Sequence, residues 1–69
     1  MKLSARNQIT GKVVGVQKGQ TTAPVRIDIG HGVIITSSIT NEAIDDLQLK
    51  EGDAAIAVIK ASDVMIAKR

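Results

Sequence analysis

The chain contains no phenylalanine, tyrosine, tryptophan or cysteine. Aromatic side chains usually supply the largest buried areas of a protein core, and a domain this small has few other sources of stability without disulfides. Its apolar residues make up 43% of the 69 positions and are nearly all Ile, Val, Ala and Leu. We therefore predict a single domain over residues 1–69 that is stabilised by association with further copies of itself.

Composition also excludes several classes of function. Without cysteine there is no thiolate metal site, and the single His31 and the scattered carboxylates lack metal-ligand spacing. A net charge of +2 is too small to indicate nucleic acid binding, and the chain lacks the aromatic side chains on which single strands stack. No apolar run resembles a signal peptide or a membrane span. The sequence thus predicts a soluble, cytoplasmic protein with neither nucleic acid nor membrane as partner.

Glycines and turn residues divide the first half of the chain into short strands. Alternating residues predict a strand over 7–17, in which the alternation slips near Gly15, as at a β-bulge. Clean alternation predicts a second strand over 23–29, with Pro24 near its start. The Gly-His-Gly turn at 30–32 then joins it to a return strand over 33–38.

The period changes at residue 40. Thr40 is a favourable N-cap and Glu42 lies in the first turn, so we predict a helix of about two turns that starts at Asn41. Two more strands follow over 54–59 and 64–67, separated by an interruption at 60–63. Three strands, a short helix and two strands match the five-stranded OB-like Greek-key barrel, an all-β fold with one helix.

No catalytic arrangement is present in the sequence. His31 lies in a turn three residues from Asp28, with no nucleophile at a recognisable spacing. Asp45 and Asp46 are adjacent on the predicted helix and point about 100° apart, as on a solvated helix face. The chain is therefore not expected to be an enzyme.

Hydrogen-bond donors for a small oxyanion occur in three places. A doubly charged tetrahedral anion requires converging donors and one or two positive charges. The N-terminal segment offers Ser4, Arg6 and Asn7, and the interrupted strand offers a lysine, a serine and free backbone N–H groups at 60–62. The start of the helix at residues 40–41 is a third candidate.

Three stretches of the sequence resemble one family. They are SARNQITGKVVGV, VIITSSITNEAIDDLQLKEGD and AVIKASDVMIAKR, and they cover nearly the whole chain. In order and spacing they are similar to the molbindins, the small molybdate-binding Mop proteins. The resemblance implies an OB-like fold, a hexamer arranged as a trimer of dimers, and binding of molybdate or tungstate at subunit interfaces for molybdenum storage or homeostasis.

The resemblance also implies which residues bind the oxyanion. Ser4 and Arg6 of one subunit would meet a second set of ligands from a neighbour, and this set comprises Lys60, Ala61 and Ser62. Asn7 would lie just outside this shell. A further site or supporting shell is expected near Gly19 or the helix start, at Thr40, Asn41 and Glu42.

A second class of function stays open at this point. The same small domain could be an oligomeric scaffold or a regulatory module whose helix and sheet edges contact another protein, without a small-molecule ligand.

Overall fold

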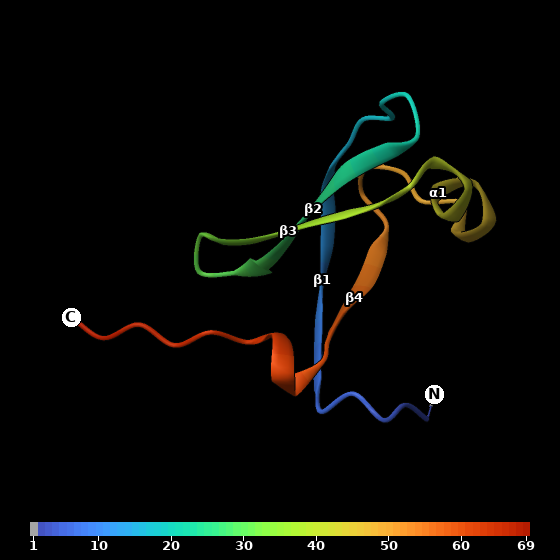
Figure 1. Cartoon of the computed structure of the whole chain (residues 1–69). Helices are drawn as coiled ribbons and strands as arrows, with labels where there is room; N and C mark the ends of the chain where they lie inside the picture. Colours follow the sequence, from blue (N-terminus) through green and yellow to red (C-terminus); the bar gives the residue numbers. More distant parts are fainter. Residues whose placement is uncertain (1) are drawn as a thin grey trace.

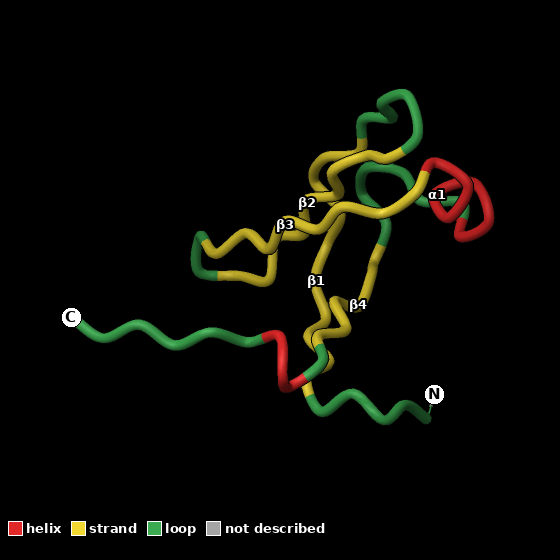
Figure 2. The backbone as a smooth tube through the Cα atoms, viewed as in Figure 1, coloured by secondary structure: helices red, strands yellow, loops and turns green. Residues whose placement is uncertain are grey.

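The computed structural model describes residues 2–69 and shows a curled antiparallel sheet with one short helix (Figures 1 and 2). The elements are β1 (Asn7–Val16), β2 (Thr22–Gly30), β3 (Val33–Thr40), α1 (Asn41–Leu47), β4 (Ala54–Ile59) and the 3₁₀ turn η1 (Ala61–Asp63). The strand order is β3-β2-β1-β4, so β3 and β4 form the two edges. Over the described residues, the structure is mostly β with one α-helix, as predicted.

Alternation in the sequence accounts for the central strands. Ala23, Val25 and Ile27 of β2 are buried while the residues between them are exposed, which is the pattern of a strand with one face in the core. The predicted bulge in β1 is confirmed, because the register with β2 shifts between Val13 and Gly15. This extra residue accounts for the slip in the alternation.

The helix starts where the sequence predicted. The Thr40 side-chain oxygen accepts a hydrogen bond from the backbone N–H of Ala43 at 3.1 Å, which satisfies one of the free donors of the first turn. Ile44 is the buried residue of α1 and joins the core formed by the sheet. Gln48 ends the helix in a left-handed conformation at φ 53°. No helix within residues 2–69 is long and apolar enough to cross a membrane.

The core is small for the amount of apolar surface that the chain carries. Its buried residues are Val13, Ala23, Val25, Ile27, Ile44 and Ala57. The chain exposes 5653 Å² in total, whereas a compact monomer of 7.3 kDa exposes about 4,200 Å². Its radius of gyration is 12.7 Å, against about 11 Å for a compact domain of this length. One chain alone is therefore incompletely packed.

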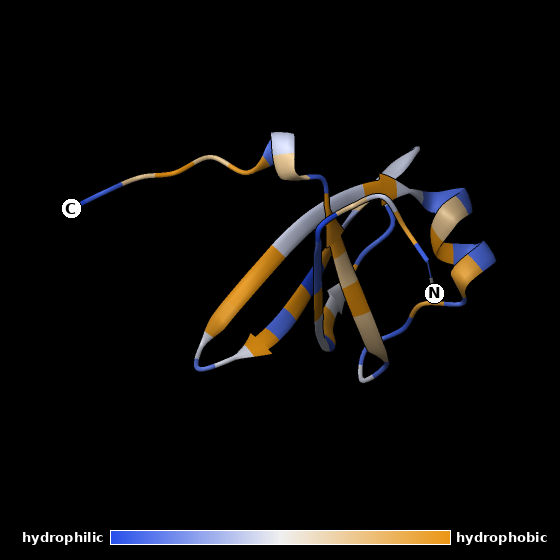
Figure 3. Cartoon of the chain, turned by 90° about the horizontal axis from the view of Figure 1, so that it is seen from below, coloured by the Kyte–Doolittle hydropathy of each residue, from blue (hydrophilic) through white to orange (hydrophobic). Residues whose placement is uncertain are grey.

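The prediction of a fifth strand within the chain is not confirmed. Residues 64–69, which we call the C-terminal tail, belong to no strand of the sheet. The tail leaves η1 in an extended conformation, with Val64 at φ −88° and ψ 122°, and runs away from the sheet (Figures 1 and 3). Strand formation requires a neighbouring strand edge for hydrogen bonding, and within residues 2–69 the tail pairs with no strand edge.

Candidate functional site

The pairing of β1 with β4 brings the predicted donor segments to one end of the sheet. Asn7, the first residue of β1, lies opposite Ile59, the last residue of β4. Ser4 and Arg6 directly precede this pair, and the 60–62 segment directly follows it. We call this region the Asn7–Ile59 end of the sheet. Segments more than 50 residues apart in sequence are thus neighbours at this end.

This end carries two positive charges, and Asp63, the carboxylate of η1, forms no ion pair with either of them. Arg6 and Lys60 are both exposed, and within residues 2–69 neither lies within ion-pair distance of an Asp or Glu. The ion pair that the described residues do form joins Lys18 to Asp45, beside the helix. Two free cations that flank one strand pair favour a doubly charged anion.

Backbone donors are also free next to these charges. The turn η1 is closed by the Asp63 N–H, which donates to the Lys60 carbonyl at 2.9 Å, and by the Val64 N–H, which donates to the Ala61 carbonyl at 3.3 Å. Within the described residues, none of the N–H groups at positions 60–62 donates to a backbone carbonyl. The first N–H groups of a 3₁₀ turn have no partner inside the turn, so these three can be directed at a ligand.

In one chain these groups form an open arrangement. The side chains of all five predicted ligands are exposed, namely Ser4, Arg6, Lys60, Ala61 and Ser62. The N-terminal segment and η1 leave the Asn7–Ile59 end in different directions (Figure 1). One chain therefore presents two donor sets side by side without enclosing a ligand between them.

The predicted second region lies where β2 begins and β3 ends, and there the loop before β2 is hydrogen-bonded to the start of the helix. The Asn41 side-chain amide donates to the Gly19 carbonyl at 2.9 Å, and the Asn41 backbone N–H donates to the Thr21 carbonyl at 2.8 Å. Thr40 uses its side-chain oxygen as the helix cap, and Glu42 adds an exposed negative charge. The structure thus brings Gly19, Thr40 and Asn41 together, and the Asn41 side-chain oxygen is buried without a hydrogen-bond partner among the described residues.

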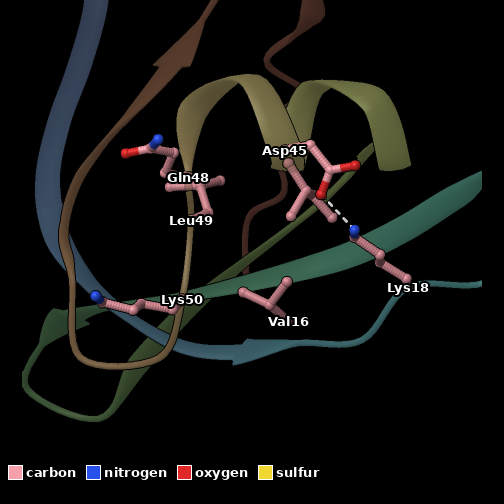
Figure 4. A pocket seen from close by; sticks show the side chains of 7 residues that line it. Val16, Lys18, Asp45, Gln48, Leu49 and Lys50 are labelled. Atoms are coloured by element: carbon pink, nitrogen blue, oxygen red, sulfur yellow. Dashed lines mark hydrogen bonds and ion pairs between the residues drawn. The ribbon is translucent and has the colours of Figure 1, made fainter.

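A shallow hollow between the end of β1 and the helix was not predicted from the sequence (Figure 4). It has a volume of about 590 Å³ and is lined by Val16, Lys18, Ile44, Asp45, Gln48, Leu49 and Lys50. The Lys18–Asp45 ion pair lies at its rim. No local sequence signal could have revealed it, because its residues come from two segments, 16–18 and 44–50, that are distant in sequence.

The residues considered for catalysis have structural roles or face solvent. His31 is exposed in the β2–β3 turn at φ 55°, and the Asp28 carboxylate accepts a hydrogen bond from the Gly30 N–H at 2.8 Å. Asp45 is paired with Lys18. Within residues 2–69, no group of three His, Cys, Asp or Glu side chains could hold a metal ion.

Comparison with known proteins adds the family. The model of the TOBE domain matches residues 3–66. Molybdenum-pterin-binding protein 3 of Clostridium pasteurianum is 53% identical over 66 residues, which cover 96% of this chain and 97% of that protein.

Two solved structures are similar along nearly the whole chain. The molybdate-binding protein from Sporomusa ovata superposes with a TM-score of 0.92 at 32% identity and covers 99% of this chain and 100% of its own. The molybdate-bound form of the cytoplasmic protein ModG superposes with a TM-score of 0.89 at 46% identity, covering 94% of this chain and 46% of ModG. The chain therefore belongs to the TOBE-domain family and, within it, to the small Mop proteins that its sequence resembles.

Proposed function

We propose that this chain binds molybdate, with tungstate as an alternative oxyanion of the same shape and charge. The observation that carries the proposal is the register of β1 and β4, which brings two unpaired cations and several free donors to the Asn7–Ile59 end. Family membership supports it, since relatives of similar length are molybdenum-pterin-binding proteins and ModG has been solved with molybdate bound.

Each ligand residue has a distinct chemical role. Arg6 and Lys60 supply the positive charge that offsets the dianion, and the Arg6 guanidinium can also donate two parallel hydrogen bonds. The hydroxyl groups of Ser4 and Ser62 donate to further oxygens. The backbone N–H groups of Ala61 and Ser62, which have no backbone acceptor in the described residues, complete the shell.

We propose further that one site is completed by two copies of the chain. The N-terminal segment and η1 run in different directions from the Asn7–Ile59 end (Figure 1), and the donor residues on both are exposed. If Ser4 and Arg6 of one copy face residues 60–62 of another, both sets close around a single anion. Ligand and assembly are then coupled, because an anion that binds only the oligomer stabilises it by mass action.

The exposed surface supports a homo-oligomer. The chain exposes roughly 1,500 Å² more than a compact monomer of its mass, and a standard protein interface buries about 800 Å² per partner. Met65 is 93% exposed and Ile66 is 88% exposed, whereas apolar side chains of this size are usually buried. The hexamer that the family resemblance implies would provide the partners.

The C-terminal tail is the segment that we propose to complete the five-stranded barrel. It is extended, its residues 64–67 are apolar, and β3 and β4 are the edge strands of the sheet. Pairing of residues 64–67 with an edge strand of another copy would satisfy the hydrogen bonds of both and bury Met65 and Ile66. The fifth strand predicted from the sequence would then form between chains.

The biological role that follows is storage or homeostasis of molybdate in the cytoplasm, without catalysis. The binding site has oxyanion donors and no arrangement for bond cleavage, and ModG, a solved relative, is described as cytoplasmic.

Isothermal titration calorimetry with sodium molybdate tests the binding site. Arg6→Ala removes a ligand and should abolish tight binding. Arg26→Ala is the matched control, because Arg26 is an exposed arginine paired opposite Gly15, roughly 25 Å along β1 from Asn7. We expect the Arg26→Ala protein to bind as the unmodified protein does. If both variants lost molybdate affinity equally, or if neither lost any, the assignment of Arg6 as a ligand would be contradicted.

A further inference from the structure

The Asn7 side chain forms a direct link between the two donor segments of one chain. Its amide nitrogen Nδ2 donates to the Ile59 carbonyl at 3.2 Å, across 52 positions of sequence. Asn7 is half-buried, while the ligands around it are exposed. At this end of the sheet, the other hydrogen bond from a side chain in the described residues is local and joins Gln8 to Ala5 at 3.4 Å.

The acceptor of this bond belongs to the peptide unit that begins the second donor segment. The Ile59 carbonyl and the Lys60 N–H are parts of one planar trans peptide, so they point in opposite directions. A hydrogen bond that fixes the carbonyl therefore also fixes the direction of the Lys60 N–H. That N–H has no backbone acceptor within residues 2–69 and starts the turn that carries the other free donors.

We propose that Asn7 is the positioning residue of the oxyanion site, an inference that rests on the proposed function above. Asn7 does not contact the anion. Its amide holds the Ile59 carbonyl and so directs the Lys60 N–H, with which the donor segment 60–62 begins, and Arg6 directly precedes Asn7 in the chain. One side chain thus sets the separation and orientation of the two donor sets that each chain contributes.

The Asn7–Ile59 hydrogen bond contributes little to the stability of the fold compared with its expected effect on molybdate affinity. The β1–β4 ladder already pairs residues 7–12 with residues 54–59, and one more neutral hydrogen bond adds little to it. Groups that orient a ligand without touching the bound species have larger effects on affinity. Their removal typically weakens metal binding by roughly 10- to 100-fold, and we expect a similar loss of molybdate affinity here.

The test compares three proteins by calorimetry with sodium molybdate. Asn7→Val removes the amide but keeps a residue that favours strands, so that β1 still pairs. Asn7→Gln keeps an amide donor on a longer side chain. Thr10→Ala is the control, because Thr10 is an exposed residue of the same strand, paired with Ile56 of β4. Thermal unfolding and native mass are measured for each variant.

We expect Asn7→Val to weaken molybdate binding by roughly 10-fold or more at unchanged stoichiometry, as for loss of an orienting group. Asn7→Gln should recover part of the lost affinity. Thr10→Ala should have no effect on it. Equal affinity of Asn7→Val and the unmodified protein would overturn the inference and leave the proposed function intact. No binding of molybdate by the unmodified protein would overturn both.

A second measurement uses the unmodified protein and does not depend on whether a variant folds. Amide ¹⁵N spectra should show the Asn7 side-chain protons protected from exchange, and protected further when molybdate is added, together with shifts at residues 60–62. Side-chain protons that exchange freely in the presence of bound molybdate would contradict a positioning role for Asn7.

Discussion

The exposed apolar tail gives the most quantitative prediction. Met65 and Ile66 keep 93% and 88% of their surface in the single chain, so nearly all of it is available for burial by another copy. Full burial of a Met or Ile side chain stabilises by about 1.5–3 kcal/mol. The two residues together should therefore stabilise the assembly by about 3–6 kcal/mol for each tail. Replacing both with serine removes this contribution.

The double substitution should greatly raise the dissociation constant of the oligomer and should hardly change the stability of the single chain. Since each 1.4 kcal/mol is about tenfold in an equilibrium constant, the dissociation constant should rise by at least roughly 100-fold per tail. The core lies in the sheet and α1, and neither Met65 nor Ile66 belongs to it. Stability of the dissociated chain should thus change by less than about 0.5 kcal/mol, as for other surface substitutions.

Sedimentation equilibrium over a dilution series measures this shift for the Met65→Ser, Ile66→Ser double variant. Lys68→Ser is the matched control, since Lys68 is exposed in the same tail and contributes little apolar area. The control should assemble as the unmodified protein does. If the double variant also dissociates at the same concentrations as the unmodified protein, the tail does not mediate assembly and the inter-chain fifth strand is wrong.

Four further substitutions test the fold, one of them as a control. Gly11→Ala should lower the free energy of unfolding by about 1–3 kcal/mol in urea, because its Cβ would lie 2.5 Å from Ile27 Cγ2, whereas Gly15→Ala meets Arg26 at an ordinary 3.5 Å and should be tolerated. Thr40→Ala should cost about 1 kcal/mol through loss of the helix cap, and a value near zero would refute the capping role. Lys18→Ala breaks an exposed ion pair and should change stability by less than about 1 kcal/mol, with any effect diminishing at high salt.

Local signals in the sequence predicted the local structure. The alternation at Ala23, Val25 and Ile27 predicted β2, the slip near Gly15 predicted the bulge, and Thr40 predicted the helix start. Each of these depends on neighbours in sequence, because side-chain period and capping chemistry act over a few residues. The same reasoning predicted a strand over residues 64–67, which pair with no strand among the described residues 2–69.

The sequence predicted which residues form the candidate site, but it did not predict how they are arranged in space. Motif resemblance indicated Ser4, Arg6 and the 60–62 segment, but only the β1–β4 register shows that both sets lie at one end of the same chain. The hydrogen bond from Asn7 to Ile59 and the Lys18–Asp45 ion pair join distant segments. Contacts of this kind follow from tertiary structure and leave no periodic pattern in the sequence.

The most direct test of the shared oxyanion site is native mass spectrometry of the unmodified protein at low micromolar concentration, with and without sodium molybdate. An oligomer that gains discrete molybdate masses, and an Arg6→Ala protein that assembles without gaining them, is the predicted result. A monomer that gains no molybdate would contradict both the shared site and the function proposed for it.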